Sequence, residues 1–301
     1  MRAASTSKPV GAHEETGHLG GAHSTYVSSA QVTNAEHENE LQVVDLPRAP
    51  PSLSKAVTYF YITGFGRFAL MEDNPTERVV LRLREILQDP GRVQMLHERL
   101  VRIVDLRILE VSAAAAHETL AEMKTQCLQM RQKPNISSDG RNRTVCFLHL
   151  GVDASADGFL VERSAVNEAL FRFPDERGWQ PTTPIPIVRG AQLGARYELD
   201  GEALASLCER TESLLNEWGR TNWTVRVNDD AGRFLCNYLF YLSAFEGLAE
   251  NGHHLWQTFF LHCPMETVAP LDVQVDVVLA FMVAVAQSNA QQGPLEGILA
   301  R

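Results

Sequence analysis

One cysteine in the sequence has the surroundings of a nucleophile. Cys236 lies in the segment DAGRFLCN, residues 230–237, which follows a predicted strand and opens a predicted helix. A cysteine in the first turns of a helix is exposed to the positive end of the helix dipole, which favours the nucleophilic thiolate. Gly232 is suited to a turn in which the backbone approaches a substrate closely. Taken alone, the segment is more typical of an inert core cysteine.

Two further residues have the types that would complete a catalytic set. His262 ends an apolar run, FFLH at residues 259–262, and a cysteine nucleophile needs an imidazole within hydrogen-bond reach. Glu162 opens the segment ERSAVN, and a carboxylate orients an imidazole through its second ring nitrogen. A lone histidine or glutamate is more often an ordinary structural or surface residue. Together with Cys236, the pair predicts thiol-dependent hydrolysis.

Strands and helices alternate along the chain and would position these residues. Apolar runs typical of buried strands and patterns typical of helices follow one another, and residues 158–170 are predicted as a turn followed by a short helix or an extended segment. The predicted strands are residues 57–63, 101–111, 144–152, 223–228 and 256–263, and the predicted helices are 76–87 (ended by Pro90 and Gly91), 113–130, 202–218, 231–248 and 271–287. This order predicts an α/β fold in a single domain: a twisted, mostly parallel mixed sheet flanked by helices on both faces, with ligands at the carboxyl ends of the strands.

Composition divides the chain into three parts. Residues 1–54 are rich in small and polar residues, so they are predicted to be a disordered N-terminal tail. Residues 55–290 are predicted to be the α/β domain, in which 173–194 form a long loop, and residues 291–301 a C-terminal tail. The purpose of the N-terminal tail and of the polar loop 131–143 is left open.

Charge and cysteine content exclude several classes of protein. The 301 residues carry a formal net charge of −10, which argues against a nucleic-acid binder. Five cysteines without a CxxC pair predict free thiols in a reducing compartment rather than a zinc site. The first thirty residues lack an apolar segment, and the apolar stretch 273–286 is too short to span a bilayer. We therefore expect a cytoplasmic protein with no membrane and no nucleic-acid partner.

The remaining thiols and histidines are interpreted as structural. Cys146 lies on a predicted buried strand, and alternation places Cys263 on the opposite side of its strand from His262. His149, near a strand end, is expected to be structural as well. No further ligand supports a metal site at residues 253–254. The acidic residues beside the nucleophile, 229–230, are expected to shape the turn by hydrogen bonds to the backbone.

Five ordered segments of the chain resemble pyroglutamyl-peptidase I, the C15 family of cysteine peptidases. The resemblance runs from about residue 57 to 284, and five segments in order are more specific than any one of them. They are TGFGRF (63–68, followed by NP at 74–75), ERSAVN (162–167), RFPD (172–175), DAGRFLCN (230–237) and FLHCP (260–264).

The resemblance implies roles for individual residues. It implies Cys236 as nucleophile, His262 as general base and acid, and Glu162 as the orienting carboxylate. It further implies Phe65 and Phe68 as aromatic contacts of the substrate ring and Arg172 as a residue near the site, while the backbone N–H groups of Leu235 and Cys236 are candidates for holding an oxyanion.

The activity implied is that of an omega peptidase: hydrolysis of an N-terminal pyroglutamyl bond through a thioester, on a phosphorylase/hydrolase-like fold, with no metal or organic cofactor. Its partners would be peptides with an N-terminal pyroglutamate, and the oligomeric state is left open. Pyroglutamate is a flat, neutral lactam, so an apolar, aromatic pocket would suit it.

The chain departs from the family's pattern in three places, and two other functions remain open. Arg67 replaces the usual proline, Ala69 the usual glycine, and Val152 the glutamine of bacterial members. One alternative is a catalytically silent relative that binds pyroglutamyl peptides or a partner protein. Another is a nucleoside phosphorylase on a similar fold, although the sequence has no recognisable phosphate-binding loop.

Overall fold

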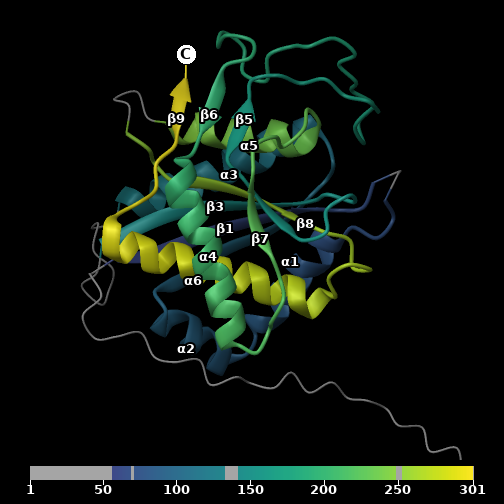
Figure 1. The fold of residues 1–301 in the computed structure, drawn as a ribbon. Coiled ribbons are helices and arrows are strands. Elements are labelled where there is room, and N and C mark those ends of the chain that lie inside the picture. The colour runs from purple at the N-terminus through teal and green to yellow at the C-terminus, as the bar shows by residue number, and fades with distance from the viewer. Residues whose placement is uncertain (1–55, 69–70, 133–141, 249–252, 301) are drawn as a thin grey trace, which may run out of the picture. The chain divides into compact units, whose positions relative to one another are not determined.

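The computed structural model describes residues 56–68, 71–132, 142–248 and 253–300 (Figure 1). The predicted tail 1–54 and most of the predicted loop 131–143 lie outside these ranges, as does Ala69.

Six strands form one mixed sheet in the order β2-β1-β3-β8-β4-β7 (Figure 1). Neighbouring strands are parallel except at one place, where β4 runs antiparallel to β8. This confirms the predicted twisted, mostly parallel sheet. The strands are β1 (Ala56–Phe65), β2 (Val101–Leu109), β3 (Asn142–Val152), β4 (Phe159–Glu162), β7 (Val225–Asn228) and β8 (Gln257–Cys263).

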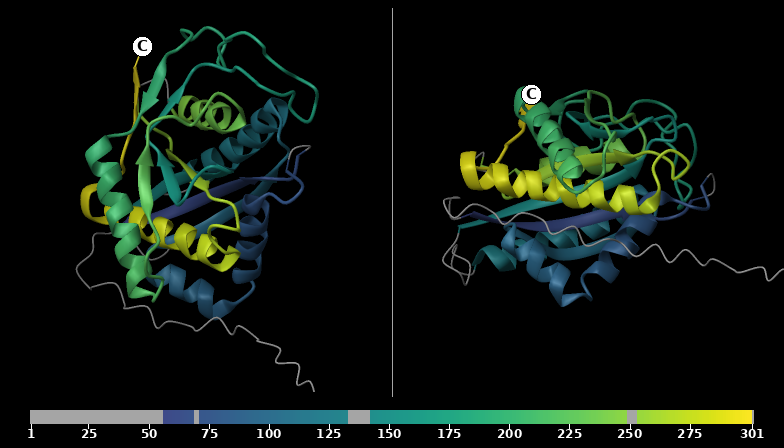
Figure 2. Two further views of the ribbon diagram at one scale, coloured as in Figure 1. Left: turned by 45° about the vertical axis from the view of Figure 1, so that its right-hand side comes forward. Right: turned by 60° about the horizontal axis from the view of Figure 1, so that its bottom comes forward.

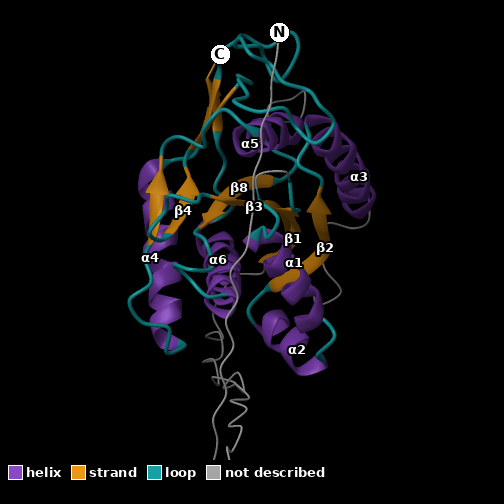
Figure 3. Ribbon diagram, turned by 90° about the vertical axis from the view of Figure 1, so that its right-hand side faces the viewer, coloured by secondary structure: helices purple, strands orange, loops and turns teal. Residues whose placement is uncertain are grey.

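Helices cover both faces of the sheet (Figure 3). On one face lie α1, α4 and α6, and α4 packs along α6 (Figure 2), while α3 and α5 lie on the other face. Because both faces are covered, the central strands are largely apolar, and β8 is buried along its whole length. The helices are α1 (Pro75–Ile86), α2 (Pro90–Glu98), α3 (Ala113–Gln132), α4 (Gly201–Glu217), α5 (Leu235–Gly247) and α6 (Leu271–Gln292).

Local sequence accounts for the start of α1 and for a helix that the sequence analysis missed. Asn74 caps α1, because its side chain accepts the N–H of Thr76 at 3.1 Å, and Pro75 occupies the first helical position. Pro90 and Gly91 were expected only to end this helix. Instead Asp89 caps a second helix, α2, in which Pro90 again takes the first position. A proline after a capping residue therefore opens a helix here rather than closing one.

A second, three-stranded antiparallel sheet contradicts one expectation and decides between two alternatives of another. It is formed by β5 (Ser164–Val166), β6 (Arg196–Glu198) and β9 (Ile298–Ala300) in the order β5-β6-β9. Of the two alternatives predicted for residues 158–170, the extended segment is therefore confirmed and the short helix is wrong. Residues 291–301 are not a free C-terminal tail, because α6 continues to Gln292 and β9 pairs with β6 (Figure 1). Strands of three residues are too short to leave a periodic pattern in the sequence.

The long helix α6 belongs to the core. Its 22 residues are numerous and apolar enough to cross a membrane, which the shorter predicted stretch 273–286 was not, but 78% of its most apolar window is buried within the protein. Gln274 and Asn289, two of its polar residues, are also buried, and they hydrogen-bond to Ala269 O and to Gln257 Oε1 respectively. The burial of α6 accounts for its apolar composition.

Candidate active site

Strand register brings the predicted catalytic residues to one region of the sheet. His262 of β8 is the register partner of Gly151 of β3 on one side and of Leu160 of β4 on the other. Glu162, two residues further along β4, ends that strand. Cys236 is the second residue of α5, the helix that packs against β8 and β3.

Hydrogen bonds join the three residues. Nδ1 of His262 lies 2.7 Å from Oε1 of Glu162, and the His262 side chain is also hydrogen-bonded to Cys236. Glu162 is fully buried and His262 is 6% exposed, whereas Cys236 is only partly buried. Of the three side chains, the Cys236 thiol is therefore the most exposed to solvent.

The surroundings of His262 favour its protonated form. Burial alone would lower the pKa of the imidazole, but the charge of Cys236 and the hydrogen bond to it raise this pKa, as do the hydrogen bond and charge of Glu162. The net effect is a His262 pKa well above its ordinary value. Since a group is protonated below its pKa, the imidazolium persists through the neutral range and stabilises a thiolate on Cys236.

A tight turn leads into the helix that carries the cysteine. Oδ1 of Asp230 accepts the N–H of Gly232 at 3.1 Å, as expected for an acidic residue that shapes a turn. Gly232 has a φ of 78°, which favours glycine. Phe234, at the cap position of α5, makes no side-chain capping hydrogen bond. The first N–H groups of α5, including those of Leu235 and Cys236, therefore point out of the helix end without an intrahelical partner.

Of the two aromatic residues of the first segment, Phe65 lies on the sheet face that α5 covers. A Cβ added to Gly64 would meet Thr76 and Val80 of α1, so the next residue, Phe65, points to the opposite face. Phe65 is buried, and Phe68 is partly buried against the same core. A contact of Phe65 or Phe68 with substrate stays a prediction.

Arg172 differs from the other predicted site residues. Its side chain is exposed, and among the described residues only its carbonyl oxygen is hydrogen-bonded, to Nε2 of Gln180 at 3.0 Å. The guanidinium forms no ion pair with any described carboxylate. A contact between Arg172 and substrate stays a prediction.

Solved structures of other proteins share this arrangement of strands and helices. No family model matches the chain. The pyrrolidone-carboxylate peptidase of Pyrococcus furiosus is 27% identical over 203 residues, which are 67% of this chain and 79% of that protein. Solved pyrrolidone carboxyl peptidases of Thermococcus litoralis and Fervidobacterium islandicum superpose with TM-scores of 0.53 and 0.52, at 21% and 22% identity. These matches cover 76% and 74% of this chain and 93% and 94% of those chains.

The fold is that of the pyrrolidone carboxyl peptidases. Pyrrolidone carboxylate is another name for pyroglutamate, so the resemblance to pyroglutamyl-peptidase I is confirmed by the relative and by the fold.

Within this pyrrolidone carboxyl peptidase fold, the RFPD segment anchors the loop that crosses the carboxyl edge of the sheet. The carboxylate of Asp175 accepts the backbone N–H of Ala113, at the start of α3, at 3.0 Å, and that of Trp179 at 2.9 Å. The loop residues 173–194 lack helices and strands, as predicted. The segment similar to the family's RxPD thus fixes a loop against α3.

An aromatic cluster beside the cysteine was not recognised from the sequence. Phe171 packs edge-on against Phe234 at 4.7 Å and against Trp179 at 5.0 Å between ring centroids. Phe234 lies two residues before Cys236, and Trp179 also contacts the ring of Tyr238. The pair Phe171 and Trp179 lies more than fifty positions before the pair Phe234 and Tyr238 in the chain, so no local pattern could reveal the cluster.

The other thiols and histidines are structural, as expected. Cys146 and Cys263 are fully buried, and burial raises the pKa of both thiols. His149 is fully buried with Nδ1 2.7 Å from Oγ1 of Thr63, and burial lowers its pKa to about 3, so it is neutral. Nε2 of His254 is bound to the carbonyl of Gly297. The described residues contain no group of three or more potential metal ligands.

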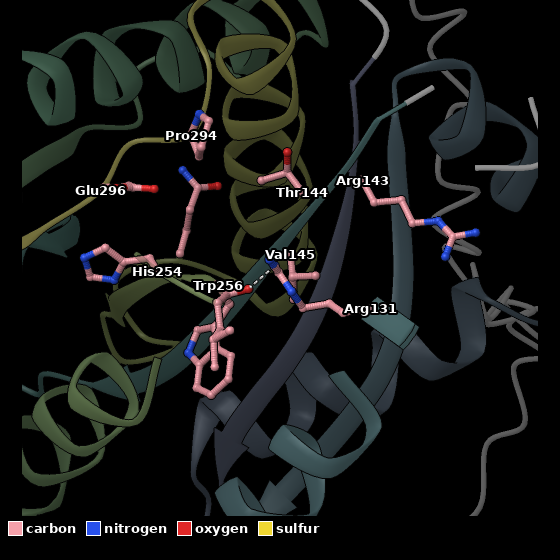
Figure 4. A pocket seen from close by; sticks show the side chains of 10 residues that line it. Arg131, Arg143, Thr144, Val145, His254, Trp256, Pro294 and Glu296 are labelled. Atoms are coloured by element: carbon pink, nitrogen blue, oxygen red, sulfur yellow. Dashed lines mark hydrogen bonds between the residues drawn. The ribbon is translucent and has the colours of Figure 1, made fainter. Parts of the chain in front are cut away.

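A cavity of about 170 Å³ lies at the other end of the sheet (Figure 4). Val145 lines it near the start of β3 and Gln257 at the start of β8, so it opens at the amino ends of these strands. Arg131 reaches across it to the carbonyl of Leu255 at 2.8 Å. Because His262 lies near the carboxyl end of β8, this cavity is separate from the candidate active site.

Gly151 is expected to be intolerant of any side chain. A Cβ at this position would lie 2.8 Å from two ring carbons of Phe260 and 3.0 Å from Sγ of Cys236. We expect Gly151→Ala to lower the free energy of unfolding by about 1–3 kcal/mol and to slow alkylation of the displaced thiol. Urea unfolding and the rate of iodoacetamide labelling of Cys236 would measure these effects.

Gly201→Ala is the matched control for this substitution. Gly201 is the first residue of α4, and its added Cβ would lie 3.5 Å from Cδ of Arg163, an ordinary contact. Stability and labelling should be unchanged or slightly improved in this variant. If Gly151→Ala matched this control in both stability and labelling rate, the inferred close approach of β3 to the Cys236 sulfur would be contradicted.

Proposed function

We propose that this chain is a cysteine peptidase that hydrolyses the bond after an N-terminal pyroglutamyl residue. The observation that carries the proposal is the hydrogen-bonded chain from Glu162 through His262 to Cys236, which ends at the N-terminus of α5. A nucleophile, a base and an orienting group in contact are the recurring arrangement of nucleophilic catalysis. The name of the Pyrococcus furiosus relative supports the choice of substrate.

In the first half of the reaction, the peptide bond is exchanged for a thioester. The Cys236 thiolate attacks the carbonyl carbon of the pyroglutamyl residue, and the carbonyl electron pair moves onto oxygen. The N–H groups of Leu235 and Cys236, which have no partner within α5, are suited to bind this oxyanion. The imidazolium of His262 then gives its proton to the amide nitrogen, the C–N bond breaks, and the shortened peptide leaves.

In the second half, water releases the product. Neutral His262 takes a proton from water, whose oxygen attacks the thioester carbon. The C–S bond breaks, pyroglutamic acid departs, and the thiolate returns beside a protonated imidazole. Glu162 accepts a hydrogen bond from the Nδ1–H of His262, which keeps the other ring nitrogen free for these transfers.

The walls of the site suit the lactam ring. Phe65 lies on the sheet face that α5 covers, and we expect it and Phe68 to offer apolar surface to a flat, neutral ring. A free N-terminal amine would be charged, and its transfer into such surroundings would cost free energy without a paired carboxylate. The same contacts therefore favour pyroglutamate over an ordinary N-terminal residue.

We also propose the cytoplasm as the location, with peptides as the partners. All five cysteines are free, and a partly exposed, reactive thiol requires a reducing environment to survive. No metal or organic cofactor has a step in the proposed reaction.

The test is release of a fluorophore from a pyroglutamyl amide in the presence of dithiothreitol. Wild-type protein should turn over this amide and leave the matching prolyl amide, which has a charged amine and no ring carbonyl, essentially intact. Cys236→Ala should be inactive with an unchanged circular dichroism spectrum. Cys208→Ala, in which a buried cysteine of α4 is lost, should retain activity.

Equal turnover of the two amides would contradict the substrate assignment, and equal turnover by Cys236→Ala would contradict the nucleophile. No turnover by folded wild-type protein would favour the catalytically silent relative. Turnover that requires phosphate would favour the phosphorylase.

A further inference from the structure

The side-chain amide of Asn228 lies against the carboxylate of the proposed triad. Asn228 ends β7, and Glu162, its register partner, ends β4. Nδ2 of Asn228 lies 3.0 Å from both carboxylate oxygens of Glu162, and 3.1 Å from the carbonyl oxygen of Asp230. One nitrogen therefore contacts both the carboxylate and the turn that leads to Cys236.

An amide nitrogen carries two protons, and both have a partner here. One N–H is shared by the two oxygens of Glu162, and the other is donated to the carbonyl of Asp230. The reverse orientation would bring the amide oxygen against three acceptors. The hydrogen bonds therefore fix which end of the amide faces Glu162.

The buried carboxylate of Glu162 is stabilised by few hydrogen-bond donors. It is fully buried, and a buried carboxylate is costly unless donors or a cation compensate it. Among the described residues, its carboxylate accepts hydrogen bonds from Nδ1–H of His262, at Oε1, and from one N–H of Asn228, at both oxygens. Within the same residues, its only ion-pair partner is His262. Asn228 thus supplies the one neutral donor to the carboxylate.

Backbone contacts hold Asn228 in this position. Its carbonyl oxygen accepts the N–H of Arg163 at 2.7 Å, and the carbonyl of the next residue, Asp229, accepts Oγ–H of Ser164 at 2.7 Å. Two hydrogen bonds therefore join the chain just after Glu162 to the end of β7 and the residue that follows it. The amide is fixed before any substrate arrives.

We propose that Asn228 is a positioning residue that fixes the plane of the Glu162 carboxylate, and so the tautomer of His262, and ties both to the Cys236 turn. This inference rests on the proposed function, but its first readout does not need turnover. Without the amide, the carboxylate is free to rotate, and the Nδ1 proton of His262 is held less firmly. The substitution should act on the chemical step and not on substrate binding.

The first experiment is proton NMR of the His262 Nδ1 proton in the full-length protein. In the wild type this proton, held by a buried carboxylate, should resonate far downfield and exchange slowly with water. In Asn228→Ala it should shift upfield and broaden, whereas Asn216→Ala, which removes an exposed asparagine of α4, should leave it unchanged. An unchanged resonance in folded Asn228→Ala would overturn the proposal, even if the protein proved to have another activity.

The second experiment is kinetic and uses the pyroglutamyl amide. Asn228→Ala should lower kcat by about 10- to 100-fold with KM nearly unchanged, as expected for loss of a hydrogen bond to a charged group. A higher KM with unchanged kcat would contradict a positioning role.

Asn228→Asp covers the case in which the alanine variant does not fold. It keeps the shape but sets a second carboxylate against Glu162, so the two must share a proton. At acidic pH the shared proton restores a donor, and at higher pH it is lost and the carboxylates repel each other. The activity of Asn228→Asp relative to wild type should therefore fall as pH rises. A ratio independent of pH would contradict the proposal.

Discussion

His262→Ala is expected to lower kcat on a pyroglutamyl amide by about 10⁶-fold, the effect of removing the base from a comparable hydrolytic triad. The imidazolium stabilises the thiolate before attack and supplies the proton that the leaving amine needs. Alanine provides neither, and the residual rate reflects substrate binding and the oxyanion contacts alone. Steady-state turnover with purified protein would measure the change.

The pH dependence of Cys236 labelling separates the two contributions of His262. Because the pKa of His262 is raised, the wild-type imidazolium is present at about pH 6 and at neutral pH beside the sulfur of Cys236. A neighbouring positive charge favours the reactive thiolate form of a cysteine. Iodoacetamide should therefore label wild-type Cys236 readily at about pH 6, and His262→Ala should label slowly there and recover only as the pH is raised.

His254→Ala is the control for both measurements, because His254 binds the carbonyl of Gly297 at the far end of the sheet. Its turnover and labelling should match those of the wild type. Turnover by His262→Ala within about tenfold of wild type would contradict the assigned base.

Glu162→Gln should lower kcat by about 10⁴-fold, as loss of the orienting charge does in a serine triad. The substitution keeps the shape of the side chain. However, the new side-chain NH₂ group is a donor and must point toward either Nδ1–H of His262 or Nδ2–H of Asn228, because both nitrogens lie within 3.0 Å of the carboxylate. One hydrogen bond is therefore lost, and the histidine no longer has a fixed tautomer.

The pH–rate profile gives a second readout for Glu162→Gln. In the wild type, Glu162 contributes to the raised pKa of His262, so its replacement should lower that pKa. Activity requires protonated His262, and the alkaline limb of kcat/KM should therefore move to lower pH. Glu266→Gln, which removes a charge paired with Arg78 at the surface, should leave the profile in place. A limb that stays put or moves to higher pH would contradict the assigned role of Glu162.

The sequence was sufficient to predict the α/β order of the fold and the three residues that the structure joins by hydrogen bonds. Apolar runs covered on both faces are readily recognised, as β1 and β8 show. The helix α2 was missed because Pro90 serves equally to end one helix and to begin another. Strands of three residues, such as β5 and β9, carry no usable periodicity.

Asn228 and the aromatic cluster of Phe171, Trp179 and Phe234 were missed for a different reason. The contact between Asn228 and Glu162 exists only because β4 and β7 pair in one particular register. The ring contacts depend on where a long loop crosses the sheet edge. Both arise from tertiary pairing, and neither has a signature in the local sequence.

The close approach of β3 at Gly151 also has a consequence for anyone who wishes to redesign the site. Beneath the sulfur of Cys236, residue 151 presents only backbone, and a side chain there would meet the ring of Phe260. This surface offers nothing to exchange, so a library of variants gains no new specificity by sampling residue 151. Diversity belongs instead along the loop that bears Trp179, where side chains are partly exposed, because loops generally tolerate substitution.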